Sequence, residues 1–323
     1  MGALTLLITG AGGYVGRYTV AAARAHDHRV IAVLRRADQA PVAWAGDPLI
    51  EVLEWDLTEP GVLPAVDAVV HIAASLSGDD TVQAYDTIAA TRNVLQAIHE
   101  SGQSPTLVLA SSISVYSGTD LTEGDTVTEA SPIERQSALR DAYCRAKIEQ
   151  ERLCLEAVVA TGLALHILRI GAVFGPGRVW NAHVGVGFGP VLLRFGQEGQ
   201  IPLAHVRHVA QVLVLATETP AVDADECVIN VVDDDLPNRG EFVKALAKGG
   251  WPRVVLPLSW RVFALAAGKR PGLPGLLRLP TLRARMMPVK YNNARLHARL
   301  GWHPEAGFKV LMRDALAAEA RDV

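Results

Sequence analysis

A glycine-rich turn near the start of the chain, between an apolar strand and an alanine-rich helix, restricts the fold more than any other feature. Residues 4–9 predict one buried strand, and residues 17–26 predict a helix. Four glycines mark the connection: Gly10, Gly12, Gly13 and Gly16. Such a turn lets a diphosphate approach the backbone closely, where the N–H groups and the positive dipole end of the helix face the phosphates. The stretch therefore predicts a dinucleotide-binding strand, turn and helix.

Strands and helices alternate along the first half of the chain. Apolar runs predict further strands at residues 29–34, 50–53, 68–72, 106–110 and 165–170, and other stretches predict helices at residues 85–100 and 141–159. This alternation is typical of a parallel sheet with helices on both faces. We therefore predict an α/β fold, a Rossmann-type doubly wound parallel sheet with a small C-terminal substrate lobe.

The alternation weakens after Gly177, which suggests a division of the chain. Residues 1–177 are expected to form the dinucleotide-binding Rossmann domain with the catalytic residues. Residues 178–323 are expected to form mostly a substrate-binding lobe. Within that part, strand candidates at 201–203 and 228–232 flank a helix at 206–217, and this segment is expected to return to the Rossmann core.

Composition excludes several classes of protein. Half of the 323 residues are hydrophobic and 20% are charged, which predicts a globular chain with a substantial core. The formal net charge of -3 provides no basic surface for a nucleic acid. No apolar run reaches the ~20 residues that span a bilayer, and no cleavable leader is expected. We therefore expect a small-molecule substrate, no nucleic-acid partner and no transmembrane segment.

Three cysteines, Cys144, Cys154 and Cys227, lack the spacing of a metal site or of a redox motif. Their odd number also argues against a disulfide framework. The sequence therefore predicts no metal site, and a reducing cytoplasm is the expected compartment.

The residues that follow the second strand indicate the choice of cofactor. In a dinucleotide fold this position meets the adenosine ribose, where a carboxylate suits the 2′-hydroxyl of NAD and an arginine suits the 2′-phosphate of NADP. The strand at 29–34 is followed by Arg35 and Arg36, and no Asp or Glu ends it. We predict that NADP(H) is preferred and that NAD(H) is the second choice. Two solvated arginines are the alternative interpretation.

Three further positions extend the predicted cofactor site. Asp56 follows the third strand and is placed to accept a hydrogen bond from the adenine amino group, although acidic loop residues are often simply solvated. Ala73 and Ala74 follow the fourth strand, where small residues let the cofactor lie close to the backbone. His71, inside that apolar strand, is interpreted as a core histidine rather than a catalytic one.

Hydroxyl groups gather after the strand at 106–110, in the run from Ser111 to Tyr116. Ligands collect at the carboxyl ends of strands in open α/β sheets, so these hydroxyls are candidates for contacts with a substrate. Tyr143 and Lys147 lie four residues apart on a predicted helix and share a face. A nearby ammonium lowers the pKa of a phenol, normally ~10, which makes Tyr143 a candidate acid and base. A surface Tyr/Lys pair is the alternative.

Together, these motifs resemble the extended short-chain dehydrogenase/reductase superfamily, over nearly the full chain and in the correct order. The matching segments are Thr9 to Gly16, Asp56 to Thr58, His71 to Ala74, Thr91 to Leu95, Ser111 to Tyr116, Tyr143 with Lys147, Phe174 to Gly177, and Leu300 to Pro304.

The resemblance implies hydride exchange at a carbonyl or alcohol carbon. It implies that Ser112 bonds the substrate oxygen, that Tyr143 is the acid and base, and that Lys147 binds the nicotinamide ribose and lowers the tyrosine pKa. Thr87 stands near the position where many members have an asparagine, which departs from a four-residue proton relay. By analogy of fold alone, the helix at 141–159 and the preceding helix are candidates for a homodimer contact.

The motifs and the resemblance together define the predicted site. The catalytic residues are Ser112, Tyr143 and Lys147, and the substrate contacts are Ser112, Ser114 and Tyr143. The predicted cofactor site comprises Gly10, Gly12, Gly13, Tyr14, Val15, Gly16, Arg35, Arg36, Asp56, Leu57, Ala73, Ala74, Tyr143 and Lys147.

Departures from the superfamily's patterns indicate the branch. Dehydratases usually have an Asp-Glu pair after the active-site Ser or Thr, where this chain has Ile113 and Ser114. Epimerases usually have acidic residues in a later segment that here reads Ile201 to His208. The second strand with Arg35 instead resembles the branch of dihydroflavonol reductases, cinnamoyl-CoA reductases and 3β-hydroxysteroid dehydrogenases.

We therefore predict an NADP(H)-dependent oxidoreductase that reduces a ketone or an aldehyde, with hydride from the nicotinamide and a proton from Tyr143. An NAD-dependent nucleotide-sugar epimerase is the alternative, and a non-catalytic NADP-sensing protein is the second alternative. Apolar residues of the lobe favour a small hydrophobic or aromatic substrate, although ordinary helix packing explains them nearly as well: Leu256, Leu258, Trp260, Phe263, Leu265, Leu273, Leu276 and Leu277.

Overall fold

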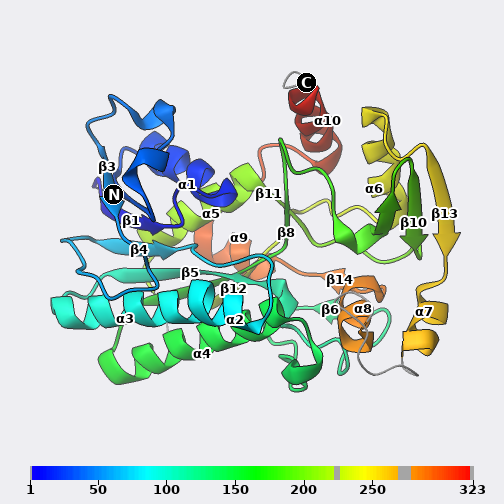
Figure 1. Ribbon diagram of the computed structural model, residues 1–323, viewed down its shortest axis with the longest axis horizontal. Coiled ribbons are helices and arrows are strands. Elements are labelled where there is room, and N and C mark those ends of the chain that lie inside the picture. Colours follow the sequence, from blue (N-terminus) through cyan, green and yellow to red (C-terminus); the bar gives the residue numbers. More distant parts are fainter. Residues whose placement is uncertain (1, 222–225, 268–277, 321–323) are drawn as a thin grey trace.

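Seven parallel strands form the central sheet in the computed structural model of the protein, which describes residues 2–221, 226–267 and 278–320 (Figure 1). The strand order is β12-β7-β5-β4-β1-β2-β3. The chain builds outward from β1 in one direction and then from β4 in the other, so the order reverses between these two strands. This arrangement confirms the predicted doubly wound Rossmann-type sheet. The strands are β1 (Thr5–Thr9), β2 (Arg29–Leu34), β3 (Ile50–Glu54), β4 (Ala68–His71), β5 (Thr106–Ser112), β7 (Leu165–Ile170) and β12 (Val228–Val231).

Helices cover both faces of the sheet, which explains why its strands are apolar along their whole length. On one face lie α1 (Tyr14–Ala25) and α5 (Val206–Glu218), which share a core with the alternate residues of β1 and β2. On the other face lie α3 (Ala90–Ser101) and α4 (Ala142–Thr161), which pack on the opposite side of the same strands (Figure 1).

The first helix starts at Tyr14, three residues before the predicted helix at 17–26. The turn before it needs Gly10, which has a φ of +65°, a value that L side chains rarely adopt. Gly16 lies where the first turn of α1 meets β1, and a Cβ there would stand 2.1 Å from the Gly10 carbonyl oxygen. The glycines therefore set how closely the start of α1 approaches the end of β1.

Two further predicted elements differ from the structure. The predicted helix at 85–100 is a π-helix at Ala84–Ala89 that continues into α3. The strand predicted at 106–110 continues to Ser112, so Ser111 and Ser112 belong to β5. Because this strand is longer, their hydroxyls lie at the carboxyl edge of the sheet and not in a loop beyond it.

The segment predicted to return to the Rossmann core divides between two places. The predicted strand at 201–203 is instead β11 (Leu203–His205), which pairs with β8 (Ala172–Phe174) outside the central sheet. The predicted strand at 228–232 is β12 and forms the edge of the central sheet beside β7. The boundary at 177 remains a prediction.

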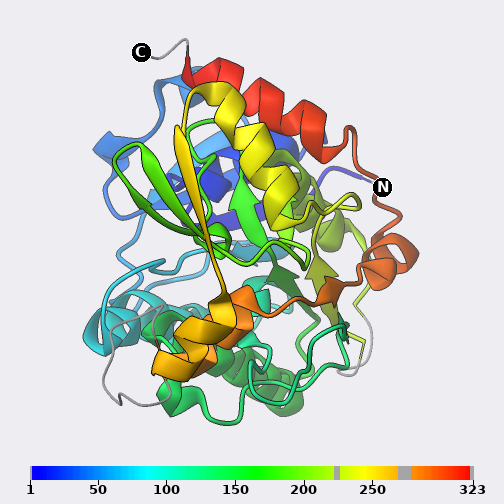
Figure 2. The same cartoon turned by 90° about the vertical axis from the view of Figure 1, so that its right-hand side faces the viewer.

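The remaining elements form a second layer beside the carboxyl edge of the central sheet. Strands β9 (Gly185–Phe188), β10 (Val191–Phe195) and β13 (Val254–Leu258) form a three-stranded sheet, and β6 (Thr126–Val127) pairs with β14 (Lys290–Tyr291). The helices of this part are α6 (Arg239–Leu246), α7 (Trp260–Ala267), α8 (Leu279–Met286) and α10 (Phe308–Glu319), whereas α9 (Ala294–Leu300) packs against β12 and α5 of the central sheet. Figure 2 shows α6 beside α10 at one end and α7 beside α8 at the other.

Short helical turns complete the described chain. They are α2 (Asp80–Gln83) and the 3₁₀ turns Ala37–Gln39, Val42–Trp44, Ile113–Val115, Ser137–Leu139, Ala182–Val184 and Ala247–Gly249. Among the described helices, none combines the length and the hydropathy that crossing a membrane requires. Leu273, Leu276 and Leu277, predicted for the substrate lobe, lie outside the described residues.

Replacing Gly16 with valine is expected to lower the free energy of unfolding by about 3 kcal/mol, because the new side chain forces α1 away from β1. Chemical denaturation followed by circular dichroism measures this loss. Gly2→Ala is the matched control, since a Cβ at Gly2 meets no atom within 4 Å. Equal stability of Gly16→Val and the wild type would contradict the close packing described above.

Candidate active site

A cavity of about 880 Å³ lies at the carboxyl edge of the central sheet, between that edge and the second layer. Its walls combine the glycine-rich turn, the ends of β2 and β5, the first turns of α4, and residues from 178–183 and 284–291. Most residues of the predicted site line it: Gly10, Gly12, Gly13, Tyr14, Val15, Gly16, Arg35, Leu57, Ala73, Ala74, Ser112, Ser114, Tyr143 and Lys147. Arg36 and Asp56 do not line this cavity.

The start of α1 provides donors for an anion on one side of the cavity. Gly13 is the N-cap residue, and it has no side chain to accept a hydrogen bond from the first N–H groups of the helix. A Cβ at Gly12 would stand 2.9 Å from Leu34 Cδ2, so a side chain there would displace the end of the Leu34 side chain. This wall therefore fits the diphosphate of a dinucleotide.

Charged residues surround the end of β2. The guanidinium of Arg35 is largely exposed and lies 3.1 Å from the Asp86 carboxylate and 3.7 Å from that of Asp56. Asp56 accepts hydrogen bonds from the Thr58 backbone N–H and hydroxyl, which lower its pKa. Arg36 pairs instead with Asp38. Of the two predicted arginines, Arg35 alone therefore reaches the cavity.

Ser112 and Tyr143 both line the cavity and share a side-chain hydrogen bond. Ser112 ends β5, and Tyr143 lies in the first turn of α4, which begins after the N-cap Asp141. Burial raises the pKa of Tyr143, and the side-chain hydrogen bond with Ser112 opposes that rise. The Lys147 ammonium lies 5.8 Å from the ring centroid and donates to Ala110 and Gln150, so its predicted effect on the phenol remains a prediction.

Lys147 is enclosed by the protein, with 3% of its surface exposed. Its ammonium donates to the Ala110 carbonyl oxygen and to Gln150 Oε1, both at 2.8 Å. Burial lowers the pKa of Lys147 to about 8, and the charge of Glu151 only partly opposes this effect. At neutral pH the ammonium is still protonated, and it is poised to lose its proton just above that pH.

A buried arginine holds the turn that carries the serines. The Arg140 guanidinium donates to the backbone carbonyls of Ser114 and Tyr116 and to the Glu134 carboxylate, at 2.9, 3.0 and 3.3 Å. Ser114 Oγ is buried, lines the cavity and has no hydrogen-bond partner among the described residues. Arg140 therefore fixes the turn, while the Ser114 oxygen itself is shielded from solvent.

The wall opposite the predicted site contains residues that we did not predict. His183 is neutral because burial lowers its pKa to about 3, and its Nδ1 donates to Asn181 Oδ1 at 2.7 Å. Arg285 lies 3.8 Å from the Asp141 carboxylate. The other members of this wall that we missed are Arg178, Trp180, Met287, Val289 and Tyr291. No motif or spacing in the sequence links them to the glycine-rich turn, from which more than 160 residues separate them.

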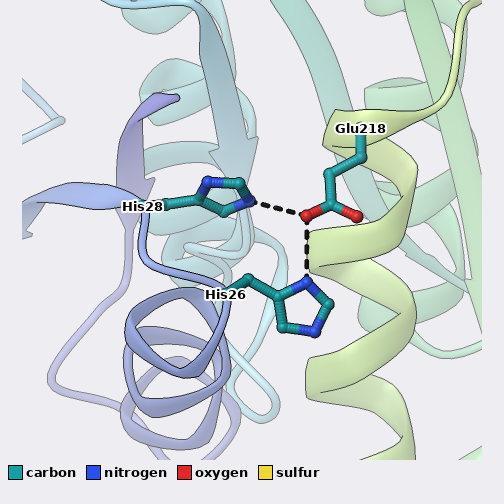
Figure 3. A group of neighbouring side chains, drawn as sticks. All are labelled: His26, His28 and Glu218. Atoms are coloured by element: carbon teal, nitrogen blue, oxygen red, sulfur yellow. Dashed lines mark hydrogen bonds and ion pairs between the residues drawn. The ribbon is translucent and has the colours of Figure 1, made fainter. Parts of the chain in front are cut away.

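Among the residues that the structure describes, one cluster has the composition of a metal site. It lies away from the cavity and consists of His26, His28 and Glu218 (Figure 3). Glu218 Oε1 accepts from His26 Nδ1 at 2.9 Å and from His28 Nε2 at 2.8 Å. The Leu4 backbone N–H donates to His28 Nδ1, so His28 must carry its proton on Nε2. That proton occupies the position a metal would need, and the group is better described as a hydrogen-bonded link between the α1–β2 turn and α5.

Comparison with known proteins identifies the family. Residues 6–231 match the model of the NAD dependent epimerase/dehydratase family, which spans more than half of the chain. The chain therefore belongs to this family, and it is an NAD(P)-dependent enzyme of the extended short-chain dehydrogenase/reductase type.

Two relatives with described activities are similar in sequence. A 3-diazoavenalumate denitrifying reductase from a Streptomyces species is 28% identical over 325 residues, which cover 93% of this chain and 96% of the relative. A 3 beta-hydroxysteroid dehydrogenase/Delta 5-->4-isomerase from Mycobacterium tuberculosis is 26% identical over 185 residues, which cover 53% of this chain. That match spans 48% of the length of the mycobacterial relative.

Solved structures share the fold at lower identity. MoeE5 in complex with UDP-glucuronic acid and NAD has a TM-score of 0.74 at 20% identity, over 99% of this chain and 100% of that one. A UDP-N-acetylglucosamine 4-epimerase from Methanobrevibacter ruminantium M1 has a TM-score of 0.74 at 17% identity, over 100% of both chains. These likenesses agree with the Rossmann-type sheet and its second layer.

The lowered pKa of Lys147 predicts a pH-dependent stability. Between pH 8 and 10.5 the unfolded chain retains a proton that the folded protein has lost, so the free energy of unfolding rises with pH in this window. Relative to Lys147→Met, the wild type should gain at most about 1.4 kcal/mol per pH unit. Denaturant titrations of both proteins at pH 7.5, 8.5 and 9.5 measure the difference. Parallel pH dependences would show that Lys147 titrates as it does in the unfolded chain.

Proposed function

We propose that this enzyme uses NADP(H) to reduce the carbonyl group of a small hydrophobic or aromatic ketone or aldehyde. The observation that carries the proposal is the placement of Ser112, Tyr143 and Lys147 in the same cavity as the free N-terminus of α1. A phenol, a hydroxyl and an ammonium beside a dinucleotide-sized cleft are the groups that such a reduction needs.

The cofactor would be held by the backbone of the glycine-rich turn, by Arg35 at the adenosine ribose, and by Ala73 and Ala74. The N–H groups at the start of α1, beside an N-cap Gly13 that has no side chain, fit a diphosphate. Lys147 would bind the nicotinamide ribose with an N–H that Ala110 and Gln150 do not use. When bound, the nicotinamide supplies the hydride that the carbonyl carbon receives.

The protein's own groups would position the carbonyl and transfer the proton. The Ser112 hydroxyl donates to the carbonyl oxygen and holds it beside the Tyr143 phenol. Burial keeps that phenol protonated at neutral pH, which suits an acid in the direction of reduction. As the oxygen gains negative charge, Tyr143 gives it the phenolic proton and becomes a phenolate. The Lys147 ammonium then stabilises the nearby negative charge.

The opposite wall of the cavity supports an apolar substrate with few polar groups. Its apolar members are Leu121, Trp180, Met287 and Val289. The neutral imidazole of His183 provides a hydrogen-bonding group in this wall. We propose that residues 178–323 select the substrate, since most of this wall belongs to them. The Streptomyces relative is named a reductase, which supports reduction over epimerisation as the proposed reaction.

Two further parts of the proposal rest on less specific features. Cys144, Cys154 and Cys227 are buried cysteines that form no disulfide with one another, which suits a reducing compartment such as the cytoplasm. A homodimer through α4 and the helix that precedes it is proposed by analogy of fold. Sedimentation analysis measures the oligomeric state directly.

Tyr143→Phe is expected to lower kcat by about 10²- to 10⁴-fold with little change in the affinity for NADPH, because the phenol acts only in proton transfer. Oxidation of NADPH with an aromatic ketone or aldehyde that the wild type reduces measures kcat. Tyr85→Phe, which changes an exposed tyrosine outside the cavity, is the control. A Tyr143→Phe enzyme with normal turnover would rule out the proposed proton donor.

Arg35→Ala is expected to weaken NADPH binding about tenfold and to leave NADH binding nearly unchanged, because only NADPH has a 2′-phosphate for Arg35. Fluorescence titration measures both affinities. Arg36→Ala is a matched control, since Arg36 pairs with Asp38 and does not line the cavity. Tightly retained NAD in the purified protein, with no effect of Arg35→Ala, would favour the nucleotide-sugar epimerase instead.

A further inference from the structure

Lys147 begins a chain of buried hydrogen bonds that leads away from the cavity. Its ammonium donates to Gln150 Oε1 at 2.8 Å, and Gln150 is fully buried. Gln150 Nε2 in turn donates to Thr91 Oγ1 at 2.7 Å, which connects α4 to α3. An ammonium only donates, so the amide must present its oxygen to Lys147 and its nitrogen to Thr91. The orientation of the Gln150 side chain is therefore determined.

Thr91 and His71 extend this series of hydrogen bonds from α3 to β4 and β1. Thr91 Oγ1 donates its proton to the Thr87 carbonyl oxygen at 2.7 Å, so it can only accept from His71 Nε2 at 3.0 Å. His71 Nδ1 must then accept from Thr9 Oγ1, at 2.9 Å. Burial lowers the pKa of His71 to about 3, which agrees with a neutral ring that has one proton.

The series of buried hydrogen bonds ends at the loops that follow β1 and β4. The Thr9 hydroxyl oxygen accepts the backbone N–H groups of Ile72 and Ala73, at 3.1 and 3.2 Å. Thr9 directly precedes Gly10, and both Gly10 and Ala73 line the cavity. The buried chain thus joins the Lys147 ammonium to two loops that are more than 70 residues away in sequence.

This series of hydrogen bonds cannot conduct a proton. Every donor in it has one acceptor, the imidazole is neutral, and a carboxamide is neither an acid nor a base near neutral pH. A proton lost from Lys147 must therefore leave through the cavity. The buried groups serve to hold the ammonium in place.

We propose that Gln150 is a positioning residue, which holds the Lys147 ammonium against the Ala110 carbonyl and, through Thr91 and His71, aligns it with the Gly10 and Ala73 loops. This inference rests on the proposed function for the role of Lys147 in the reaction. The hydrogen bonds themselves do not depend on that role.

A neutral amide at position 150 also limits the charge around Lys147. The titratable groups that face it are His71 on β4, and Tyr143, Glu151 and Cys154 on α4. Glu151 is committed to the Arg169 guanidinium at 2.8 and 3.0 Å and to the Ser111 hydroxyl. A second carboxylate at position 150 would be the one acid in direct contact with the ammonium.

The test compares Gln150→Glu and Gln150→Met with the wild type. Gln150→Glu keeps the acceptor for the Lys147 ammonium and adds a charge, so the pKa of Lys147 should rise by about one unit, although the carboxylate no longer donates to Thr91. Gln150→Met keeps the volume and removes the acceptor, so this pKa should fall by about one unit and NADPH should bind about tenfold more weakly. Gln96→Glu, at an exposed position of α3, makes the same charge change away from the site.

The Lys147 pKa is read from the ¹³C shift of its Cε in lysine-labelled protein, assigned with Lys147→Met, and affinity from NADPH fluorescence. In the reductase assay the basic limb of the pH profile should move with the Cε titration. If Gln150→Met does not fold, the upward shift in Gln150→Glu alone tests the proposal. Identical Cε titrations in wild type and Gln150→Glu would overturn it. Shifted titrations in a protein that reduces no carbonyl would support the positioning role and refute the proposed reaction.

Discussion

The constraint on which the rest of the structure depends is that all seven strands of the central sheet run parallel. Their carboxyl ends then share one edge, and each strand delivers its following loop to that edge. In this way Gly10 after β1, Arg35 after β2, Ala73 after β4 and Ser112 at the end of β5 reach one cavity. The reversal of strand order between β1 and β4 separates the helices that follow, which leaves a cleft there for a dinucleotide.

The site is stable because its buried charges are paired or well solvated by polar groups. The Glu151 carboxylate forms a bidentate pair with Arg169, and Arg140 is neutralised by Glu134 while it binds two carbonyls of the serine turn. Breaking a buried pair of this kind typically costs about 3–5 kcal/mol, so both pairs strongly favour one conformation of the site. Lys147 differs from them, because only neutral groups accept from its ammonium and burial lowers its pKa. A lysine that titrates near neutral pH suits a site that moves protons.

Much of this arrangement could be predicted because local patterns carry it. The glycine-rich turn, the strand and helix periods, and the four-residue spacing of Tyr143 and Lys147 each depend on neighbours in sequence, and the structure places all of these residues on the cavity. Errors occurred where longer-range packing decides. The strand expected at 201–203 forms at Leu203–His205 and pairs with β8, and α1 starts at Tyr14 because its first turn fits against the backbone of Gly10. Asp56 and Arg36 follow strands as predicted but do not line the cavity, and their side chains bind Thr58 and Asp38.

The sequence by itself determined the class of fold, the phosphate-facing turn and the set of reactive side chains, because these follow from residue type and short spacing. Only the tertiary structure decided how those side chains behave. Burial sets the direction of the Tyr143 pKa, and the acceptors that fold around Lys147 turn its ammonium toward Ala110 and Gln150 instead of the phenol. Likewise, Trp180, His183 and Arg285 join the cavity only because the second layer folds back over the sheet edge. Desolvation and contact across more than a hundred residues are properties of the packed chain, and no local pattern encodes them.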